Sequence, residues 1–227
     1  MKFARRVKKV GIDSARRLRV FAVYAIVVGL LTGCGTVATE RFYTLADASI
    51  DAPPLISAGS DTRPAAPTIV ISAITIPELI DRPQIVTRDG ANRVNVSEQH
   101  LWAEPLKSAI GRVIAARLAQ TLSSARVAAY PQSSIANPDL RVTIDVQRLD
   151  AVPGGEAFIE TLWTVRRTSD DATRSGRTMA RRAVDGVAYE DAVRAWSAAL
   201  DDVVRAISVA SSELVVATSR DTTPKQR

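Results

Sequence analysis

Hydrophobic and polar positions alternate with a period of two along several stretches of the chain, a pattern typical of strands with one buried face. In the clearest stretch, Leu140, Val142, Ile144 and Val146 alternate with polar side chains. Apolar or β-branched runs bounded by turn residues predict further strands at residues 41–45, 68–76, 84–88, 93–96, 127–130, 157–167 and 178–184. The last strands, from residue 140 onward, read as an antiparallel meander. Residues 89–92, Asp-Gly-Ala-Asn, predict the tip of a hairpin between residues 84–88 and 93–96.

The period changes to a helical one in residues 102–122 and again in residues 189–216. The apolar face of the first helix is expected to hold Leu106, Ile110, Val113, Ile114, Leu118 and Leu122. Its polar face is expected to hold Lys107, Arg112, Arg117 and Gln120. The core stripe of the second helix is expected to hold Val193, Trp196, Leu200, Val203, Val204, Ile207 and Leu214.

Two amphipathic helices against an antiparallel or mixed sheet predict an α+β fold. One domain is expected at residues 68–217, followed by a polar tail at 218–227. Residues 47–67 are rich in Pro, Ser, Ala and Asp and indicate a linker. The short strand before this linker is expected to dock onto the domain, because Phe42, Tyr43 and Leu45 are costly to leave in water.

Residues 1–33 have the layout of an export signal. Eight Lys and Arg residues precede an apolar run at residues 20–31. Twelve residues span roughly 18 Å as a helix, which is too short for a bilayer core of about 30 Å. The run ends in Leu31-Thr32-Gly33-Cys34, which resembles the bacterial lipobox. This resemblance implies that Cys34 becomes the first residue and carries a diacylglycerol and an N-acyl chain.

A lipidated Cys34 would anchor the protein to a membrane without spanning it. The next residue is Gly35 rather than the aspartate that usually retains enterobacterial lipoproteins in the inner membrane. The expected location is therefore the periplasm-facing inner leaflet of the outer membrane. Residues 34–67 would then form a lipidated N-terminus with the short strand and the linker. Cys34 is also the only cysteine, so no disulfide is expected.

Removal of the signal changes the charge balance. The full chain has 30 basic and 24 acidic residues, but eight of the basic residues and one acidic residue precede Cys34. The mature chain is therefore close to neutral, and its composition gives no reason to expect a nucleic-acid partner.

The residues that catalysis would need are scarce. His100 is the only histidine, which excludes a histidine-based metal cluster. No nucleophile-elbow sequence is present, and Gly154-Gly155 lies between predicted strands rather than before a helix. We expect no enzymatic activity, no metal and no bound nucleotide, with a structural or capping role for His100 just before the first helix.

Three segments together resemble the ABC-type transport auxiliary lipoproteins of the paraquat-inducible protein C type. They are Arg41-Phe-Tyr-Thr-Leu, the block at residues 76–88 and Trp102-Ala-Glu-Pro-Leu106. The distinctive positions are Asp81, Arg82, Pro83, Gln84 and Trp102. These five positions mark the family motif and are candidates for a partner interface. The simpler interpretation of Asp81-Arg82-Pro83 is a turn between two strands.

The resemblance implies a non-enzymatic accessory subunit. Family members accompany an ATP-binding cassette transporter and a periplasmic mammalian-cell-entry (MCE) domain protein, and these systems move phospholipid or other hydrophobic molecules between the two membranes. The lipoprotein would dock or cap the periplasmic assembly at the outer membrane, and a homo-oligomer is expected. Two alternatives remain open: a shuttle whose helices open over the sheet to hold an acyl chain, and an envelope-stabilising lipoprotein without a transport role.

The last predicted hairpin is the most basic region of the mature chain. It carries Arg166, Arg167, Arg174, Arg177, Arg181 and Arg182, partly offset by nearby aspartates. Arg166, Arg167, Arg177 and Arg181 are candidates for contact with phospholipid headgroups or an acidic partner. Long side chains that cover an exposed sheet face explain them equally well. The three tryptophans are expected in the core, with Trp102 and Trp196 on helices and Trp163 on a strand.

Overall fold

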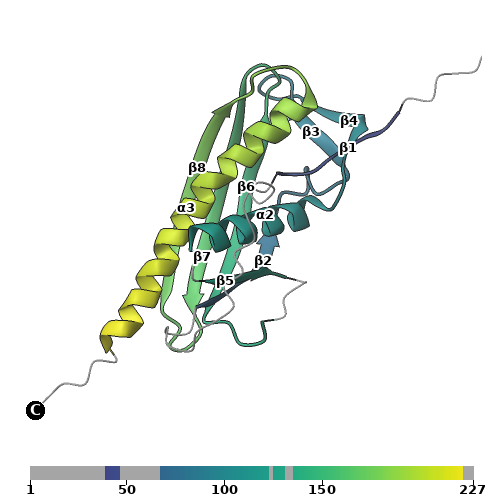
Figure 1. The fold of residues 1–227 in the computed structure, drawn as a ribbon. Helices are drawn as coiled ribbons and strands as arrows, with labels where there is room; N and C mark the ends of the chain where they lie inside the picture. The colour runs from purple at the N-terminus through teal and green to yellow at the C-terminus, as the bar shows by residue number, and fades with distance from the viewer. Residues whose placement is uncertain (1–38, 47–66, 123–124, 131–134, 222–227) are drawn as a thin grey trace, which may run out of the picture. The chain divides into compact units, whose positions relative to one another are not determined.

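The second predicted helix and the long strands of the meander form the largest part of the structure (Figure 1). This computed structural model describes residues 39–46, 67–122, 125–130 and 135–221, with side chains as far as Val216. All but Thr39 belong to one compact unit, Glu40–Arg227. The predicted export signal, Cys34 and nearly all of the predicted linker lie outside the described residues.

The larger sheet has five strands in the order β5-β2-β6-β7-β8. Their bounds are β2 Thr68–Thr75, β5 Arg126–Ala129, β6 Leu140–Ala151, β7 Glu156–Arg167 and β8 Thr173–Ala183. The strands β6, β7 and β8 are antiparallel, as the predicted meander requires. β2, however, pairs in parallel with both β5 and β6. The chain returns from β2 to β5 through a helix, and such a crossover is what parallel neighbours need. The sheet is therefore mixed.

A second sheet of three strands has the order β1-β4-β3. Its strands are β1 Arg41–Tyr43, β3 Gln84–Arg88 and β4 Val94–Trp102. The predicted hairpin between β3 and β4 is present, with Gly90 at φ 86° in its tip. The prediction ended the second strand of this hairpin at Val96, but β4 continues to Trp102. The reason is that β1 pairs in parallel with the end of β4, a long-range contact that local periodicity does not report.

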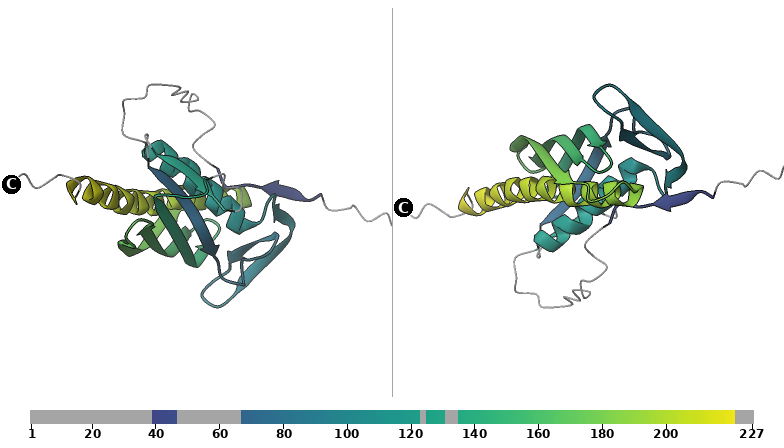
Figure 2. Two further views of the ribbon diagram at one scale, coloured as in Figure 1. Left: turned by 90° about the horizontal axis from the view of Figure 1, so that it is seen from below. Right: turned by 90° about the horizontal axis from the view of Figure 1, so that it is seen from above.

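Helix α2 spans Leu106–Thr121 and helix α3 spans Tyr189–Asp221. Both cover one face of the larger sheet, as the views from two sides show (Figure 2). The predicted start of α2 at Trp102 is wrong, because Trp102 is the last residue of β4 and Pro105 precedes the first helical residue. The helix α3 continues five residues beyond Val216, where the prediction ended it. Within the described ranges, no helix combines the length and the apolar composition needed to cross a bilayer.

The core lies between the two helices and the inner face of the larger sheet. Its fully buried side chains include Ile69, Ile71, Ile110, Ile114, Leu118, Val142, Ile144, Ile159, Leu200 and Ile207. Trp102 and Trp196 pack against each other with ring centroids 5.9 Å apart, and Trp196 Nε1 donates a hydrogen bond to Asp150 O. The strand β8 begins five residues before the predicted Thr178. This places Gly176 opposite Trp163, where a Cβ would lie 2.3 Å from the indole.

Candidate functional site

Residues 41–46 lead into the domain, and we call them the leading segment. Both sheet pairing and side-chain contacts hold this segment in place. Ala103 N donates to Tyr43 O at 2.8 Å, and Leu45 is buried in the core with 1% of its surface exposed. The predicted docking of this segment is therefore confirmed. Phe42 is the exception, because its side chain is on the other face of β1 and remains 62% exposed.

Arg117 of α2 binds the end of this segment. Its Nη2 donates to Ala46 O at 2.7 Å, and its Nη1 donates to Ser197 O at 2.5 Å and to the carboxylate of Asp201 at 2.7 Å. The prediction that Arg117 lies on a polar face is wrong, because its side chain is buried. A guanidinium tolerates burial here because one carboxylate and two carbonyl oxygens surround it. Arg117 thus joins α2, α3 and the leading segment.

A second arginine, five residues earlier along α2, holds the same segment. Arg112 Nη2 donates to Thr44 Oγ1 at 2.9 Å, to Leu45 O at 3.1 Å and to Glu104 Oε1 at 2.8 Å. Thr44 Oγ1 donates to the same Glu104 carboxylate at 3.2 Å. We call Thr44, Leu45, Ala46, Arg112 and Arg117 the N-terminal clasp. It links the first family-like segment to the third, which contains Glu104.

His100 joins β4 to β1 and α3. Its Nδ1 lies 2.7 Å from the Tyr43 hydroxyl, and its ring stacks on Tyr189 with centroids 4.1 Å apart. Partial burial, together with the positive charge of Arg41, lowers the pKa of His100 below its ordinary value of 6.5. The prediction that placed His100 just before a helix is wrong, because it lies within strand β4. The ring thus brings together β1, β4 and the first residue of α3.

The remaining family-motif residues occupy the loop before β3 and the end of β4. Asp81, Arg82 and Pro83 are exposed, and Gln84 begins β3. Asp81 forms an ion pair with Lys107 at 2.5 Å, while Pro83 O accepts a hydrogen bond from Trp102 N at 2.7 Å. The motif therefore fixes the small sheet to the start of α2. Its exposed part is the loop, whereas the Trp102 side chain is buried.

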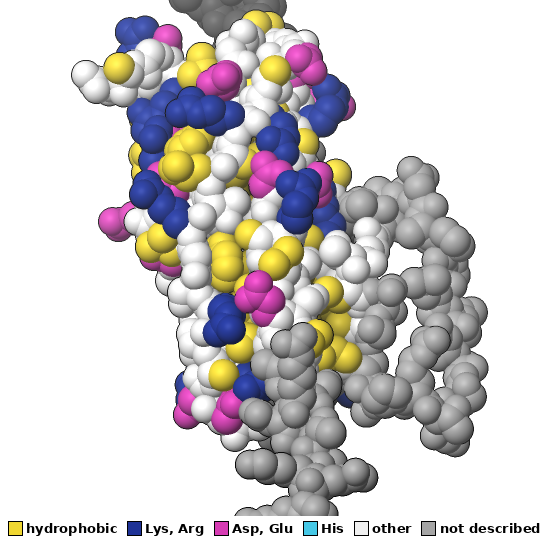
Figure 3. Space-filling view, turned by 90° about the vertical axis from the view of Figure 1, so that its left-hand side faces the viewer, with side chains coloured by type: hydrophobic (Ala, Val, Ile, Leu, Met, Phe, Trp, Pro, Cys, Tyr) yellow, Lys and Arg dark blue, Asp and Glu magenta, His cyan; other side chains and the backbone are white. Residues whose placement is uncertain are grey.

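The arginines of the last hairpin are all engaged within the chain. Each forms an ion pair, and the pairs are Arg166–Asp171, Arg167–Asp170, Arg174–Glu213, Arg177–Glu160, Arg181–Glu156 and Arg182–Asp202. Hydrogen bonding by Arg167 is the main cause that lowers the pKa of Asp170 to about 2. Basic and acidic side chains are accordingly interspersed over the face that Figure 3 presents. Such an alternating surface favours the interpretation as a solvated sheet face over that of a strong anion-binding patch.

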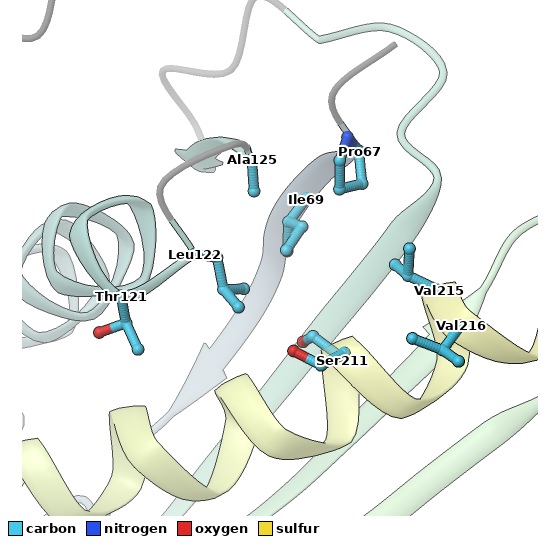
Figure 4. A pocket seen from close by; sticks show the side chains of 9 residues that line it. Pro67, Ile69, Thr121, Leu122, Ala125, Ser211, Val215 and Val216 are labelled. Carbon is cyan, nitrogen blue, oxygen red and sulfur yellow. The ribbon is translucent and has the colours of Figure 1, made fainter. Parts of the chain in front are cut away.

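A hollow opens where the end of α2, the start of β2 and the last described turns of α3 meet (Figure 4). Its volume is about 340 Å³, and its lining contains no charged side chain. The lining residues are Pro67, Ile69, Thr121, Leu122, Ala125, Ser211, Ser212, Val215 and Val216. Ser211 Oγ is buried there without a hydrogen-bond partner. The sequence pattern gave no sign of this hollow, because its residues come from three segments far apart in the chain.

We find no candidate metal-binding site in the part of the chain that the structure describes. Those residues contain no group of three or more His, Cys, Asp or Glu side chains that could hold a metal ion.

The comparisons with known proteins agree with the resemblance of the three motif segments. The chain matches the family model of the ABC-type transport auxiliary lipoprotein component over residues 43–208, and it therefore belongs to this family. By this membership the protein is an ABC-type transport auxiliary lipoprotein component. The matched region begins in β1 and ends in α3, so it includes the whole N-terminal clasp.

Two solved structures have a similar fold. Protein XCC0632 from Xanthomonas campestris is 17% identical with a TM-score of 0.58, and the match covers 81% of this chain and 100% of that one. The crystal structure of an uncharacterized protein is 14% identical with a TM-score of 0.61, covering 75% of this chain and 97% of that one. At these identities the likeness shows the fold alone. No curated protein matches the chain.

Proposed function

We propose that this protein is the outer-membrane-anchored accessory lipoprotein of an ABC/MCE-type transport system for lipids or other hydrophobic molecules. In this proposal, Cys34 carries a diacylglycerol and an N-acyl chain that hold the protein in the inner leaflet of the outer membrane. The folded body faces the periplasm and docks or caps the MCE subunit, as a homo-oligomer. The observation that carries the proposal is the family match over almost the whole folded unit.

The N-terminal clasp supports a close attachment to the membrane. Six residues separate Cys34 from Arg41, where β1 begins. A chain of that length spans at most about 25 Å when extended. The predicted linker begins after Ala46, so it does not lengthen the connection between the lipid and β1. The body would therefore remain near the headgroups and present its loops to a partner at a limited distance.

The closed packing of the helices bears on the shuttle alternative. A shuttle that opens α2 and α3 over the sheet would have to break the bonds from Arg117 to Ser197 and Asp201. Its cavity would also have to grow, because 340 Å³ is at the small end of ligand pockets and too small for a two-chain phospholipid. These contacts favour a docking role over a role as a carrier of whole phospholipids.

Lipidation and sorting can be tested in one experiment. The full chain and its Cys34→Ser variant are expressed with their own signal, and the envelope is separated into inner and outer membranes on a density gradient. We expect the wild-type protein in the outer-membrane fraction, with an N-terminal peptide whose mass includes three acyl chains. The Cys34→Ser protein should be absent from that fraction. Wild-type protein without acyl chains, or in the soluble fraction, would refute the anchored role.

A further inference from the structure

The hollow at the end of α2 has one polar group that its surroundings leave unexplained. Ser211 is 1% exposed, and its hydroxyl has no hydrogen-bond partner. Two neighbouring hydroxyls, by contrast, have a hydrogen-bond partner. Thr121 Oγ1 donates to Arg117 O at 2.8 Å, and Ser208 Oγ donates to Val204 O at 2.7 Å. Buried polar groups are nearly always paired, so an orphan hydroxyl in the wall of a pocket needs a partner.

The orientation of Ser211 matches that need. Its side chain projects from α3 on the side that faces Leu122 and Ile69, and Val215 and Val216 follow on the same helix (Figure 4). Apart from the hydroxyls of Thr121, Ser211 and Ser212, the side chains that line the hollow are hydrocarbon. An occupant has to be apolar along most of its length and carry an oxygen at one position.

A second hollow adjoins the first. It shares Thr121, Leu122, Ser212 and Val216 with the first and extends to Arg174 and Glu213. These two charged residues form an ion pair 3.2 Å long, and about half of each side chain is exposed. The second hollow thus adds charged side chains beside the uncharged lining of the first.

We propose that this hollow binds a single acyl chain, with the Ser211 hydroxyl donating a hydrogen bond to its carboxyl or ester oxygen. The volume of about 340 Å³ lies at the lower end of ligand pockets, which suits one chain. The acyl chain belongs either to a free fatty acid or to a membrane phospholipid, since both offer a hydrocarbon tail that ends in an acceptor oxygen. The site is independent of the docking role, because none of its lining residues belongs to the family motif or the N-terminal clasp.

Photo-crosslinking tests the site in the intact protein. The full lipidated chain in phosphatidylethanolamine vesicles receives either diazirine-labelled palmitic acid or a phosphatidylethanolamine with one diazirine-labelled chain, and the adducts are mapped by mass spectrometry. We expect adducts on peptides that contain Leu122 or Val215. Labelling by the fatty acid alone identifies the free acid as the source, and labelling by the phospholipid identifies the bilayer. Adducts confined to exposed positions such as Val187 would overturn the proposal.

Two variants and a matched control make the result specific. Leu122→Trp fills the hollow and should abolish the adducts. Ser211→Ala should weaken labelling and, without ligand, raise the melting temperature, because it removes an unpaired buried hydroxyl. Thr161 is the control, since its hydroxyl is also buried and unpaired but is on β7, outside the hollow. Thr161→Val should raise the melting temperature and leave labelling unchanged.

Unchanged labelling in both pocket variants would overturn the proposal. If Leu122→Trp fails to fold, Ser211→Ala alone still tests it.

Discussion

The guanidinium of Arg117 lies 2.7 Å from the carbonyl oxygen of Ala46, and this contact ties the middle of α2 to the leading segment of the domain. The same side chain reaches Ser197 and Asp201 on α3. One residue therefore connects three parts of the chain that are distant in sequence. This connection adds to the pairing of β1 with β4 and to the contacts of Arg112 in holding the segment at residues 41–46.

Replacement of Arg117 should destabilise the protein strongly. Arg117→Met keeps the hydrocarbon stem but leaves two carbonyl oxygens and the Asp201 carboxylate without their donor. We expect the free energy of unfolding to fall by about 2–4 kcal/mol. Arg112→Met is the matched control, and its cost should stay below about 1 kcal/mol because the Arg112 side chain is 39% exposed, against 9% for Arg117. Urea denaturation of the two variants measures the difference. An equal loss of unfolding free energy in both variants would show that the burial of Arg117 does not increase its contribution to stability.

The two faces of the leading segment should respond differently to truncation. Leu45 is 1% exposed, so Leu45→Ala should cost about 2–5 kcal/mol. Phe42 is 62% exposed, and Phe42→Ala should change stability by no more than about 0.5 kcal/mol. Thermal denaturation followed by circular dichroism provides the comparison. A large loss for Phe42→Ala alone would mean that β1 docks by its opposite face.

The small residue at position 176 should be required by the indole opposite it. A Cβ at Gly176 would lie 2.3 Å from Trp163, so Gly176→Ala forces the indole or the edge strand to move. We expect a loss of about 1–3 kcal/mol from overpacking. The double variant Gly176→Ala/Trp163→Leu should lose less than the sum of the two single variants. Additive losses in that cycle would refute a direct clash.

Stability should depend on pH through His100. Its pKa is lowered in the folded protein, so the unfolded chain binds the proton more readily. Stability should therefore be complete above about pH 6.5 and decrease as the pH falls from that ordinary value toward the lower folded value. Denaturation midpoints at pH 7.5 and 5.5 measure this decrease for the wild type and for His100→Gln. The His100→Gln variant should show a smaller decrease, and an identical one would assign the effect to other groups.

Local patterns predicted the elements well where each element has its own period. The strand β6 shows strict alternation, α2 and α3 show apolar stripes, and turn residues mark the tip between β3 and β4. These signals depend on neighbours in the chain. The mixed sheet was harder to predict, because the parallel partners of β2 follow from a crossover and not from its own composition. The helical pattern also predicts a helix at Trp102, whereas this residue ends β4 and pairs with Tyr43 of β1, a partner far away in the chain.

The candidate sites were predictable to different degrees. The sequence pointed to the exposed loop at Asp81, Arg82 and Pro83 through the family resemblance. The burial of Arg117 could not be predicted from helical periodicity, which treats any arginine as polar surface. Its carboxylate and carbonyl partners are some 70 to 84 residues away in the chain. The hollow beside Ser211 also needed the tertiary arrangement, because it is formed by β2, α2 and α3 together.

Docking to a transport assembly is the central claim, and co-purification from the native envelope tests it most directly. The full chain with a C-terminal affinity tag is extracted in mild detergent, and the captured proteins are quantified by mass spectrometry. We expect an MCE-domain protein and its ABC transporter in a fixed ratio to the bait. The loop variant Asp81→Ala/Arg82→Ala should reduce both, while Glu190→Ala, an exposed change at the start of α3, should not. Recovery of the lipoprotein without either transport subunit would contradict the account.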